Sequence, residues 1–263
     1  MNGASRKSYL TLIGLWVLSV PSICSQAANS PTEQAIAASI ANANRPEDDI
    51  AQDAWRKPQV VLDFLAVKPG MQALDYLAGS GYYSELISRI VGPKGHVIVY
   101  NNPRYAKSKS VGDKLPKRFA NDRLPNTQVV IMDTKDLVLA PASLDVVLLA
   151  QSYHDLYWQP NDDPEPFGDP IKITADLFRA LKSGGAVVVL DHSARSGMKP
   201  KFTAGLFHRI DSQVVRDDFV RAGFVFDGEL NVLRNPDDKL MQSVFDDNIR
   251  RKTDQFIYRF HKP

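Results

Sequence analysis

The feature that most constrains the fold is an alternation of short apolar runs with amphipathic segments over residues 46–263. Apolar runs typical of strands covered on both faces occupy residues 73–76, 96–100, 127–132, 144–150 and 186–190. Segments with helical spacing of apolar residues occupy residues 60–65, 82–91, 115–122, 171–181 and 212–222. Strands that alternate with helices in this way predict an α/β fold, with a doubly wound, mostly parallel sheet covered on both faces.

The first 27 residues have the features of a secretory signal peptide. Arg6 and Lys7 precede an apolar run over residues 9–20, which is too short to span a bilayer comfortably, and the segment ends in Ser25-Gln26-Ala27. We therefore expect a cleaved signal over residues 1–27 and a periplasmic or secreted protein. A flexible leader or a marginal helix is expected over residues 28–45, followed by one domain over residues 46–263 without an integral membrane segment.

Cleavage of this signal would leave a chain with neither net charge nor a thiol. Removing Arg6 and Lys7 from the 32 basic residues leaves 30, against 30 acidic residues, so no basic face for a nucleic acid is implied. The only cysteine, Cys24, lies within the signal, which excludes disulfides and thiolate chemistry from the mature chain. A small molecule is the expected partner.

Small residues follow the first predicted strand, in the segment LDYLAGSGYYS over residues 74–84. Gly79 and Gly81 would let backbone N–H groups approach a ligand closely, and Ser80 adds a hydroxyl. A G-x-G pair alone is a weak signal. Its position, after a strand that carries Asp75 and before a helix, favours a cofactor loop at the carboxyl ends of the strands.

Six stretches together resemble the class I S-adenosylmethionine-dependent methyltransferases, and in particular a secreted or periplasmic group of predicted methyltransferases. They are KPGM at 68–71, DYLAGSG at 75–81, GPKG at 92–95, YHD at 153–155, DHS at 191–193 and LRNP at 233–236. The resemblance covers about residues 46–263. It implies a three-layer, Rossmann-like methyltransferase fold with a seven-stranded sheet and a reversed last strand, for which residues 224–226 and 256–260 are the final strand candidates. It also implies S-adenosylmethionine as the cofactor.

The same resemblance implies where the cofactor would be held. The positions that match are Asp75, Gly79, Ser80, Gly81, Asn101 and Asp133. The first four would hold the methionine part. Asn101 stands where the family usually has an acid on the ribose hydroxyls, and Asp133 matches the polar position that usually meets the adenine amino group.

Leu77 departs from the family's pattern, because such loops usually carry a small residue there. We expect Leu77 to adopt an ordinary turn with φ below zero. Its side chain would either pack under the loop, which is the preferred alternative, or fill the space of the cofactor.

Three histidines are expected at the reacting end of the sheet, each with an acid nearby. The pairs are His154 with Asp155, His192 with Asp191, and His208 with Asp211. Histidine can take a proton from an attacking group, so His154 is the first candidate for a catalytic base and His192 the second, with Asp155 beside them. The same histidines could be hydrogen-bonded scaffold groups or metal ligands. No H-E-x-x-H or similar spacing occurs, so no metal is predicted.

The function predicted from these features is methyl transfer from S-adenosylmethionine to a small-molecule acceptor. One alternative is a protein with a degenerate methyltransferase fold that binds a ligand without turnover. The departures from the family's pattern at Leu77 and Asn101 favour this alternative. Another is a metal-dependent hydrolase or lyase that uses the His/Asp cluster, and a dinucleotide dehydrogenase fits the last two strands less well. The polar insertions 159–170 and 235–254 are read either as lids or as solvated excursions.

Overall fold

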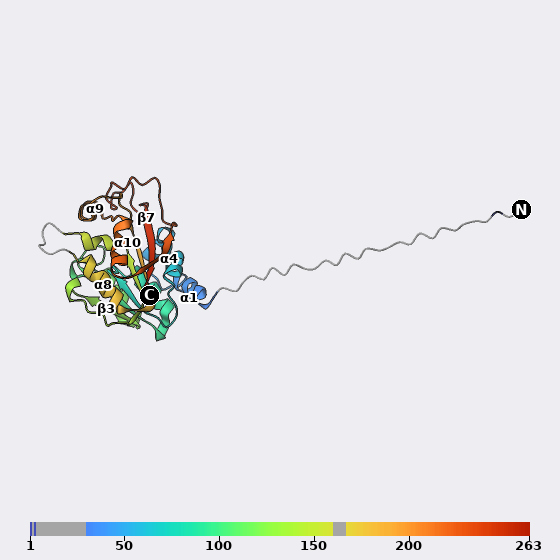
Figure 1. The fold of residues 1–263 in the computed structure, drawn as a ribbon. Coiled ribbons are helices and arrows are strands. Elements are labelled where there is room, and N and C mark those ends of the chain that lie inside the picture. Colours follow the sequence, from blue (N-terminus) through green and yellow to red (C-terminus); the bar gives the residue numbers. More distant parts are fainter. Residues whose placement is uncertain (2, 4–29, 160–166) are drawn as a thin grey trace.

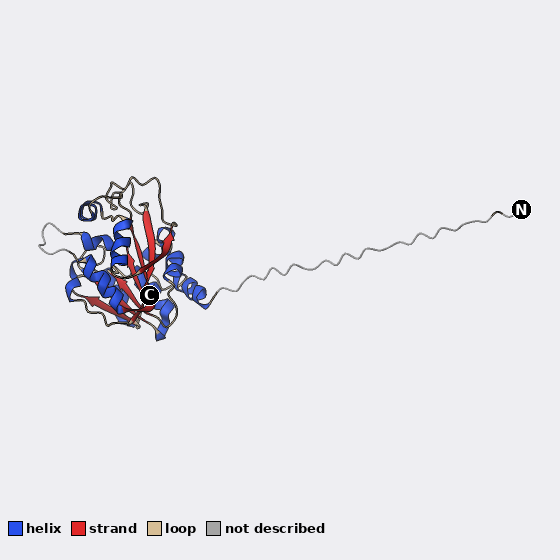
Figure 2. Cartoon of the chain, in the orientation of Figure 1, coloured by secondary structure: helices blue, strands red, loops and turns tan. Residues whose placement is uncertain are grey.

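The computed structural model describes residues 1, 3, 30–159 and 167–263. The expected signal peptide and the centre of the 159–170 insertion lie outside the described residues. Seven strands form one sheet: β1 (Gln72–Tyr76), β2 (His96–Asn101), β3 (Thr127–Ile131), β4 (Leu144–Ala150), β5 (Leu181–His192), β6 (Val225–Leu230) and β7 (Gln255–His261). Figure 2 shows this sheet in the centre of the molecule, with helices on both sides.

The strand order is β3-β2-β1-β4-β5-β7-β6. Strands β1 to β5 pair in parallel, and β7 runs antiparallel to both β5 and β6. The predicted α/β fold, with a mostly parallel seven-stranded sheet and a reversed last strand, is therefore confirmed. The order reverses between β1 and β4, and such a switch point opens a crevice at the carboxyl ends of the strands.

The helices are α1 (Pro31–Ile40), α2 (Glu47–Ile50), α3 (Asp53–Arg56), α4 (Pro58–Leu65), α5 (Tyr82–Val91), α6 (Pro103–Ala106), α7 (Lys114–Phe119), α8 (Pro170–Ala180), α9 (Pro200–Phe207) and α10 (Ser212–Arg221). Short 3₁₀ turns are η1 (Gly92–Lys94), η2 (Ala120–Asp122), η3 (Thr134–Asp136) and η4 (Tyr153–Tyr157). Helices α1, α4 and α5 share one core with the sheet, and α8 and α10 share the other, which gives three layers (Figure 1).

Both faces of the central strands are buried because successive side chains point to opposite sides. Val147 of β4 packs into the same core as Leu177 of α8. Its neighbour Val146 packs into the opposite core, with Leu86 of α5. This two-sided burial accounts for the continuous apolar runs that predicted the strands.

Helix α1 corrects the expectation of a flexible leader over residues 28–45. Ser30 and Glu33 form a capping box at its start. Ile36 is fully buried in the core beside α5, and the Ser39 hydroxyl donates to the carbonyl of Leu86 at 2.9 Å. The helical alternative for this stretch is thus the one observed, and the domain begins before residue 46. The sequence signal was weak because Ile36 is the only large apolar side chain that α1 buries fully.

Two further elements differ from the expectations. Helix α9 was not predicted, and it packs against η4 at the carboxyl edge of the sheet. Strand β6 extends to Leu230 past an irregular register between Phe226 and Gly228, whereas only residues 224–226 were expected. Over the residues with described structure, no helix combines the length and the apolarity needed to cross a bilayer.

Ile36→Ala should lower the free energy of unfolding by about 2–5 kcal/mol, because a fully buried isoleucine is truncated in a packed core. Ala38→Ser on the exposed side of the same helix is the control and should change stability little. Urea unfolding of both variants tests the docking of α1. Equal stability of Ile36→Ala and the parent chain would mean that α1 does not contribute to the core.

Candidate functional site

A cavity of about 870 Å³ opens at the carboxyl edge of the parallel strands. This volume lies within the range of sites that enclose small organic ligands. Residues at or just after the carboxyl ends of the strands β1 to β5 line it, among them Gly79, Asn102, Asp133, His154 and His192. The structure therefore brings the predicted cofactor loop and the predicted histidines to one cavity.

The loop after β1 is built from left-handed residues. Gly79 has φ +59° and Gly81 has φ +84°, and Leu77 has φ +54°. The expected ordinary turn at Leu77 is wrong, and this residue bears a backbone cost of about 1–2 kcal/mol for an L-residue in that region. The Leu77 side chain is 2% exposed and belongs to the same core cluster as Tyr76 and Tyr100, so it packs under the loop, and Leu77 also forms part of the cavity lining. Burial of this side chain offsets the cost.

Asn101 secures the loop and does not face the cavity. Its Oδ1 accepts from the Gly79 N–H and its Nδ2 donates to the Gly79 carbonyl, both at 2.9 Å. The side chain is fully buried, and of the two neighbouring asparagines only Asn102 lines the described cavity. This arrangement gives no support to the predicted ribose contact of Asn101, because the side chain is directed at the loop. An amide can both accept and donate, which a carboxylate cannot, and this explains an asparagine here.

Asp75 lies at the cavity floor with 2% of its surface exposed. Its Oδ2 accepts from the Ser84 hydroxyl at 2.5 Å. Burial raises the pKa of Asp75 to about 6, although the hydrogen bonds from Ser84 act in the opposite direction. An ammonium group in the cavity would favour the charged form of Asp75, which is compatible with the predicted role of Asp75 toward the methionine part of the cofactor.

Arg56 also lines the cavity, and sequence reasoning missed it. It ends the short helix α3, and its guanidinium lies 4.7 Å from the ring centroid of Tyr82. No motif marks this position. The residue comes 19 positions before Asp75 and reaches the cavity only through the packing of α3 on α5.

Ser80 lines the cavity, whereas Gly81 lies outside the described cavity lining, where it contacts Arg118. A Cβ at Gly81 would lie 2.9 Å from Cδ of Arg118. Arg118 donates to the Ser80 carbonyl at 2.6 Å and forms an ion pair of 2.5 Å with Glu85. The absence of a side chain at Gly81 thus leaves room for Arg118, which fixes the loop. Gly81 is not part of the described cavity lining, so its predicted cofactor contact has no support there. Asp133 does line the cavity, at the end of β3.

His154 is held by a single carboxylate at the end of β5. Asp191 Oδ1 lies 2.8 Å from His154 Nδ1, and its Oδ2 accepts the His154 backbone N–H at 2.9 Å. Burial alone would lower the pKa of His154, but the charges of Asp191 and Asp155 outweigh it and raise the pKa to about 9. A ring that is protonated at neutral pH cannot accept a proton, which argues against His154 as the base.

His192 has the opposite electrostatics. Its Nδ1 lies 2.8 Å from the Thr253 hydroxyl. Burial lowers the pKa of His192 to about 3, the charge of His154 contributes in the same direction, and Asp191 only partly compensates. His192 is therefore neutral and offers Nε2 to a ligand as a hydrogen-bonding group.

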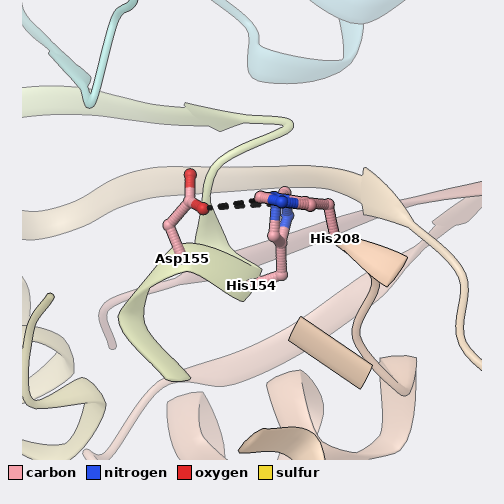
Figure 3. A group of neighbouring side chains, drawn as sticks. All are labelled: His154, Asp155 and His208. Carbon is pink, nitrogen blue, oxygen red and sulfur yellow. Dashed lines mark ion pairs between the residues drawn. The ribbon is translucent and has the colours of Figure 1, made fainter. Parts of the chain in front are cut away.

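His208 completes the cluster from a distant part of the chain. It follows α9 in the left-handed region, and its ring centroid lies 5.5 Å from that of Trp158 and 4.8 Å from that of Phe245. Its Nδ1 is 3.8 Å from Asp155 Oδ1. Figure 3 shows the Asp155 carboxylate directed at the imidazoles of His154 and His208. The expected partner of His208, Asp211, instead caps α10.

The 235–254 insertion lies over this edge of the sheet. Val244 and Phe245 line the cavity, and the Val244 N–H bonds to the carbonyl of Phe207 in α9 at 3.1 Å. Arg209, which is fully buried, anchors the insertion through Asp238 at 2.8 Å. In Figure 1 the segment between β6 and β7 runs beside α9. Part of the insertion therefore covers the cavity, which agrees with its interpretation as a lid.

Comparisons with known proteins agree with this architecture. The family model described as Protein-L-isoaspartate(D-aspartate) O-methyltransferase matches residues 54–149. A ubiquinone/menaquinone biosynthesis C-methyltransferase UbiE of Vibrio campbellii is 28% identical over 141 residues, which are 53% of this chain and 47% of that protein. The UbiE of Idiomarina loihiensis is 27% identical over 139 residues, 53% of this chain and 49% of that protein. The chain thus spans about half the length of the curated relatives it matches.

Solved structures extend the likeness to most of the chain. A SAM-dependent methyltransferase from Aquifex aeolicus superposes with a TM-score of 0.57 at 18% identity, over 90% of this chain and all of that one. The chain has the class I S-adenosylmethionine-dependent methyltransferase fold. The resemblance found in the sequence is confirmed at this level. The [4+2]-cyclase SpnF also superposes, with a TM-score of 0.57 at 16% identity over 81% of this chain and 82% of that one. The fold therefore does not by itself fix the reaction.

Asp75→Asn should change how stability depends on pH. The folded pKa of about 6 exceeds the ordinary 3.8, so ionisation of Asp75 costs stability as the pH rises from about 4 to about 6. The variant should lack this cost and be more stable at pH 7 by up to about 3 kcal/mol, with little difference from the parent below pH 4. Urea unfolding across this range measures it. If stability depends on pH in the same way in both proteins, then folding does not raise the pKa of Asp75.

Asn101→Asp should not improve the site, although an acid is what the family usually has there. The carboxylate cannot donate to the Gly79 carbonyl, and we expect a loss of about 1–3 kcal/mol in stability with no gain in affinity for S-adenosylhomocysteine. Asn231→Asp is the control, since Asn231 is exposed and lies outside the described cavity lining, and it should change neither stability nor affinity. Thermal unfolding and calorimetric titration measure both effects. Tighter binding by Asn101→Asp would place residue 101 on the ligand.

Proposed function

We propose that this protein transfers a methyl group from S-adenosylmethionine to a small organic acceptor. The observation that carries the proposal is the loop after β1, whose backbone at Gly79 and Ser80 borders a large cavity at the switch point of the sheet. A ligand can approach these peptide groups because glycine has no side chain of its own. The named methyltransferases that the chain resembles support the same reaction.

The cavity residues fit the polar end of this cofactor. A Cβ placed on Gly79 would be in van der Waals contact with Tyr105 at 3.7 Å and with Val111 at 4.0 Å, and both of these side chains line the cavity beside the glycine. Asp75 would meet the amino group and Arg56 the carboxylate of the methionine part, because both line the same cavity with opposite charge. Asp133, at the end of β3, would meet the adenine. S-adenosylmethionine supplies an electrophilic methyl group on a sulfonium, and the chain's part is to hold and orient it.

The acceptor would occupy the part of the cavity near the histidines. Aromatic side chains form its wall there, including Trp158, Phe167 and Phe245. Such a wall favours an organic molecule with apolar surface and a few polar atoms. His192, neutral and hydrogen-bonded to Thr253, would orient a polar atom of the acceptor without carrying charge.

The alternatives from the sequence are less well supported. Leu77 packs in the core and Asn101 bonds to the loop, so the two residues that favoured a degenerate site leave the cavity open. The relatives that the chain matches are named as methyltransferases, which favours methyl transfer over a hydrolase or lyase reaction.

Gly79→Val should weaken S-adenosylhomocysteine binding at least tenfold, a loss of about 1.4 kcal/mol or more, because the new side chain enters the space of the ligand. Gly70→Val is the matched control, since Gly70 also has a positive φ of +84° but has no neighbour within 4 Å of its Cβ position and lies outside the described cavity lining. Calorimetric titration of the three proteins gives the affinities.

Both valine variants carry similar backbone strain, so their thermal unfolding should fall together while only Gly79→Val loses affinity. Micromolar binding by the parent chain supports the proposal. Failure of the parent chain to bind either S-adenosylmethionine or S-adenosylhomocysteine would refute it, and equal affinity of Gly79→Val and Gly70→Val would place the cofactor elsewhere.

A further inference from the structure

We infer that His154, Asp155 and His208 form a binding site for one divalent transition-metal ion in the wall of the cavity. The first two residues lie in η4 after β4, and the third follows α9. All three line the cavity, so an ion held there would face the space in which the acceptor is expected. Sequence spacing did not indicate a metal, because the third ligand lies more than 50 positions away and is brought in by α9.

The distances between the donor atoms suit an ion. One donor atom from each residue lies within 4.8 Å of the other two. His154 Nε2 is 3.4 Å from Asp155 Oδ1, and His208 Nδ1 is 3.8 Å from the same oxygen. Tetrahedral bonds of about 2.0–2.1 Å place neighbouring ligand atoms about 3.3 Å apart, so the cluster needs to close by no more than about 1.5 Å. The His208 side chain is 22% exposed and can make this adjustment.

The outer contact of His154 is an independent indication. Asp191, without exposed surface, lies 2.8 Å from His154 Nδ1 and fixes the ring so that Nε2 points at Asp155. Metal-binding histidines commonly donate their second ring nitrogen to a carboxylate in this way, which sets the tautomer and strengthens the ligand. The ion would displace the proton from His154 Nε2, so binding would release a proton. Asp191 is itself held by the backbone N–H groups of residues 154 and 192.

Two imidazoles and one carboxylate define the class of ion. Such donor sets bind Zn²⁺, Fe²⁺ and neighbouring divalent ions rather than Mg²⁺ or Ca²⁺, which prefer oxygen ligands. Three protein ligands on one side leave the remaining positions open toward the cavity. This is the arrangement of a metal site that takes up a further ligand, whereas structural sites are closed by four protein ligands.

The site also suggests a substrate class, a step that rests on the proposed function. An acceptor with an ionisable hydroxyl could coordinate the ion through its oxygen, and coordination would lower the pKa of that hydroxyl. The methyl group would pass from sulfur to this oxygen, the C–S bond electrons would stay on sulfur, and the hydroxyl proton would be released to solvent.

Metal binding itself is the test, and it does not require turnover. The purified full chain without an affinity tag is stripped with a chelator and titrated calorimetrically with ZnCl₂ and with MnCl₂. We expect one Zn²⁺ per chain, with affinity reduced at least about 100-fold in His208→Ala and in Asp155→Asn. Asp191→Asn should lose about 10–100-fold, as expected for an outer contact.

His96→Ala is the matched control, because His96 begins β2 at the opposite edge of the sheet and lies outside the described cavity lining. Its Zn²⁺ affinity should equal that of the parent chain. Circular dichroism in chelator checks that each variant folds, and His208→Ala, which removes a partly exposed side chain, should do so. A parent chain without saturable Zn²⁺ binding would overturn the inference, as would binding unchanged in both His208→Ala and Asp155→Asn. Either result would leave S-adenosylhomocysteine binding, and thus the proposed function, untouched.

Discussion

The carboxylate of Asp191 is the group on which the arrangement of the site most depends. It is buried without exposed surface at the end of β5, and a buried charge of this kind is tolerated only when donors surround it. The backbone and ring of His154 and the backbone of His192 supply those donors. They tie η4 to the end of β5, and this fixes both the direction of the His154 ring and, through the chain, the position of Asp155.

Two features of the loop side of the cavity, at Leu77 and Asp75, lower the stability of the fold while the cavity stays open. Leu77 adopts a left-handed conformation, and Asp75 is buried at the cost of a raised pKa. Neither feature helps the chain to fold. Asn101 and Arg118 hold the loop from below through the backbone of Gly79 and Ser80. The residues that hold this strained loop in place, Asn101 and Arg118, thus lie outside the described cavity lining.

The sheet could be predicted from the sequence because its physical cause is local. Strands buried on both faces are continuous apolar runs, and the predicted limits of β4 coincide with the observed ones. The site could be predicted only in part. That His154 and His192 share an edge follows from parallel strands. The orientation of Asn101, the contribution of Arg56 and the pairing of His208 with Asp155 instead of Asp211 depend on packing between distant elements, for which the sequence carries no periodic signal. Helix α1 was predicted only as an alternative to a flexible leader for a related reason, since its docking rests on Ile36 and Ser39.

Arg209 anchors the 235–254 insertion, and this has a consequence for which parts of the cavity can vary without disturbing the rest. The guanidinium bonds to the carbonyls of Ser193 and Gln242 as well as to Asp238, so the base of the insertion is fixed to the strand end that carries His192. Phe245, farther along, is 58% exposed at the cavity mouth. Replacement of residues near Phe245 can therefore alter which molecules enter, while the buried contacts of Arg209 still hold the strand end that carries His192.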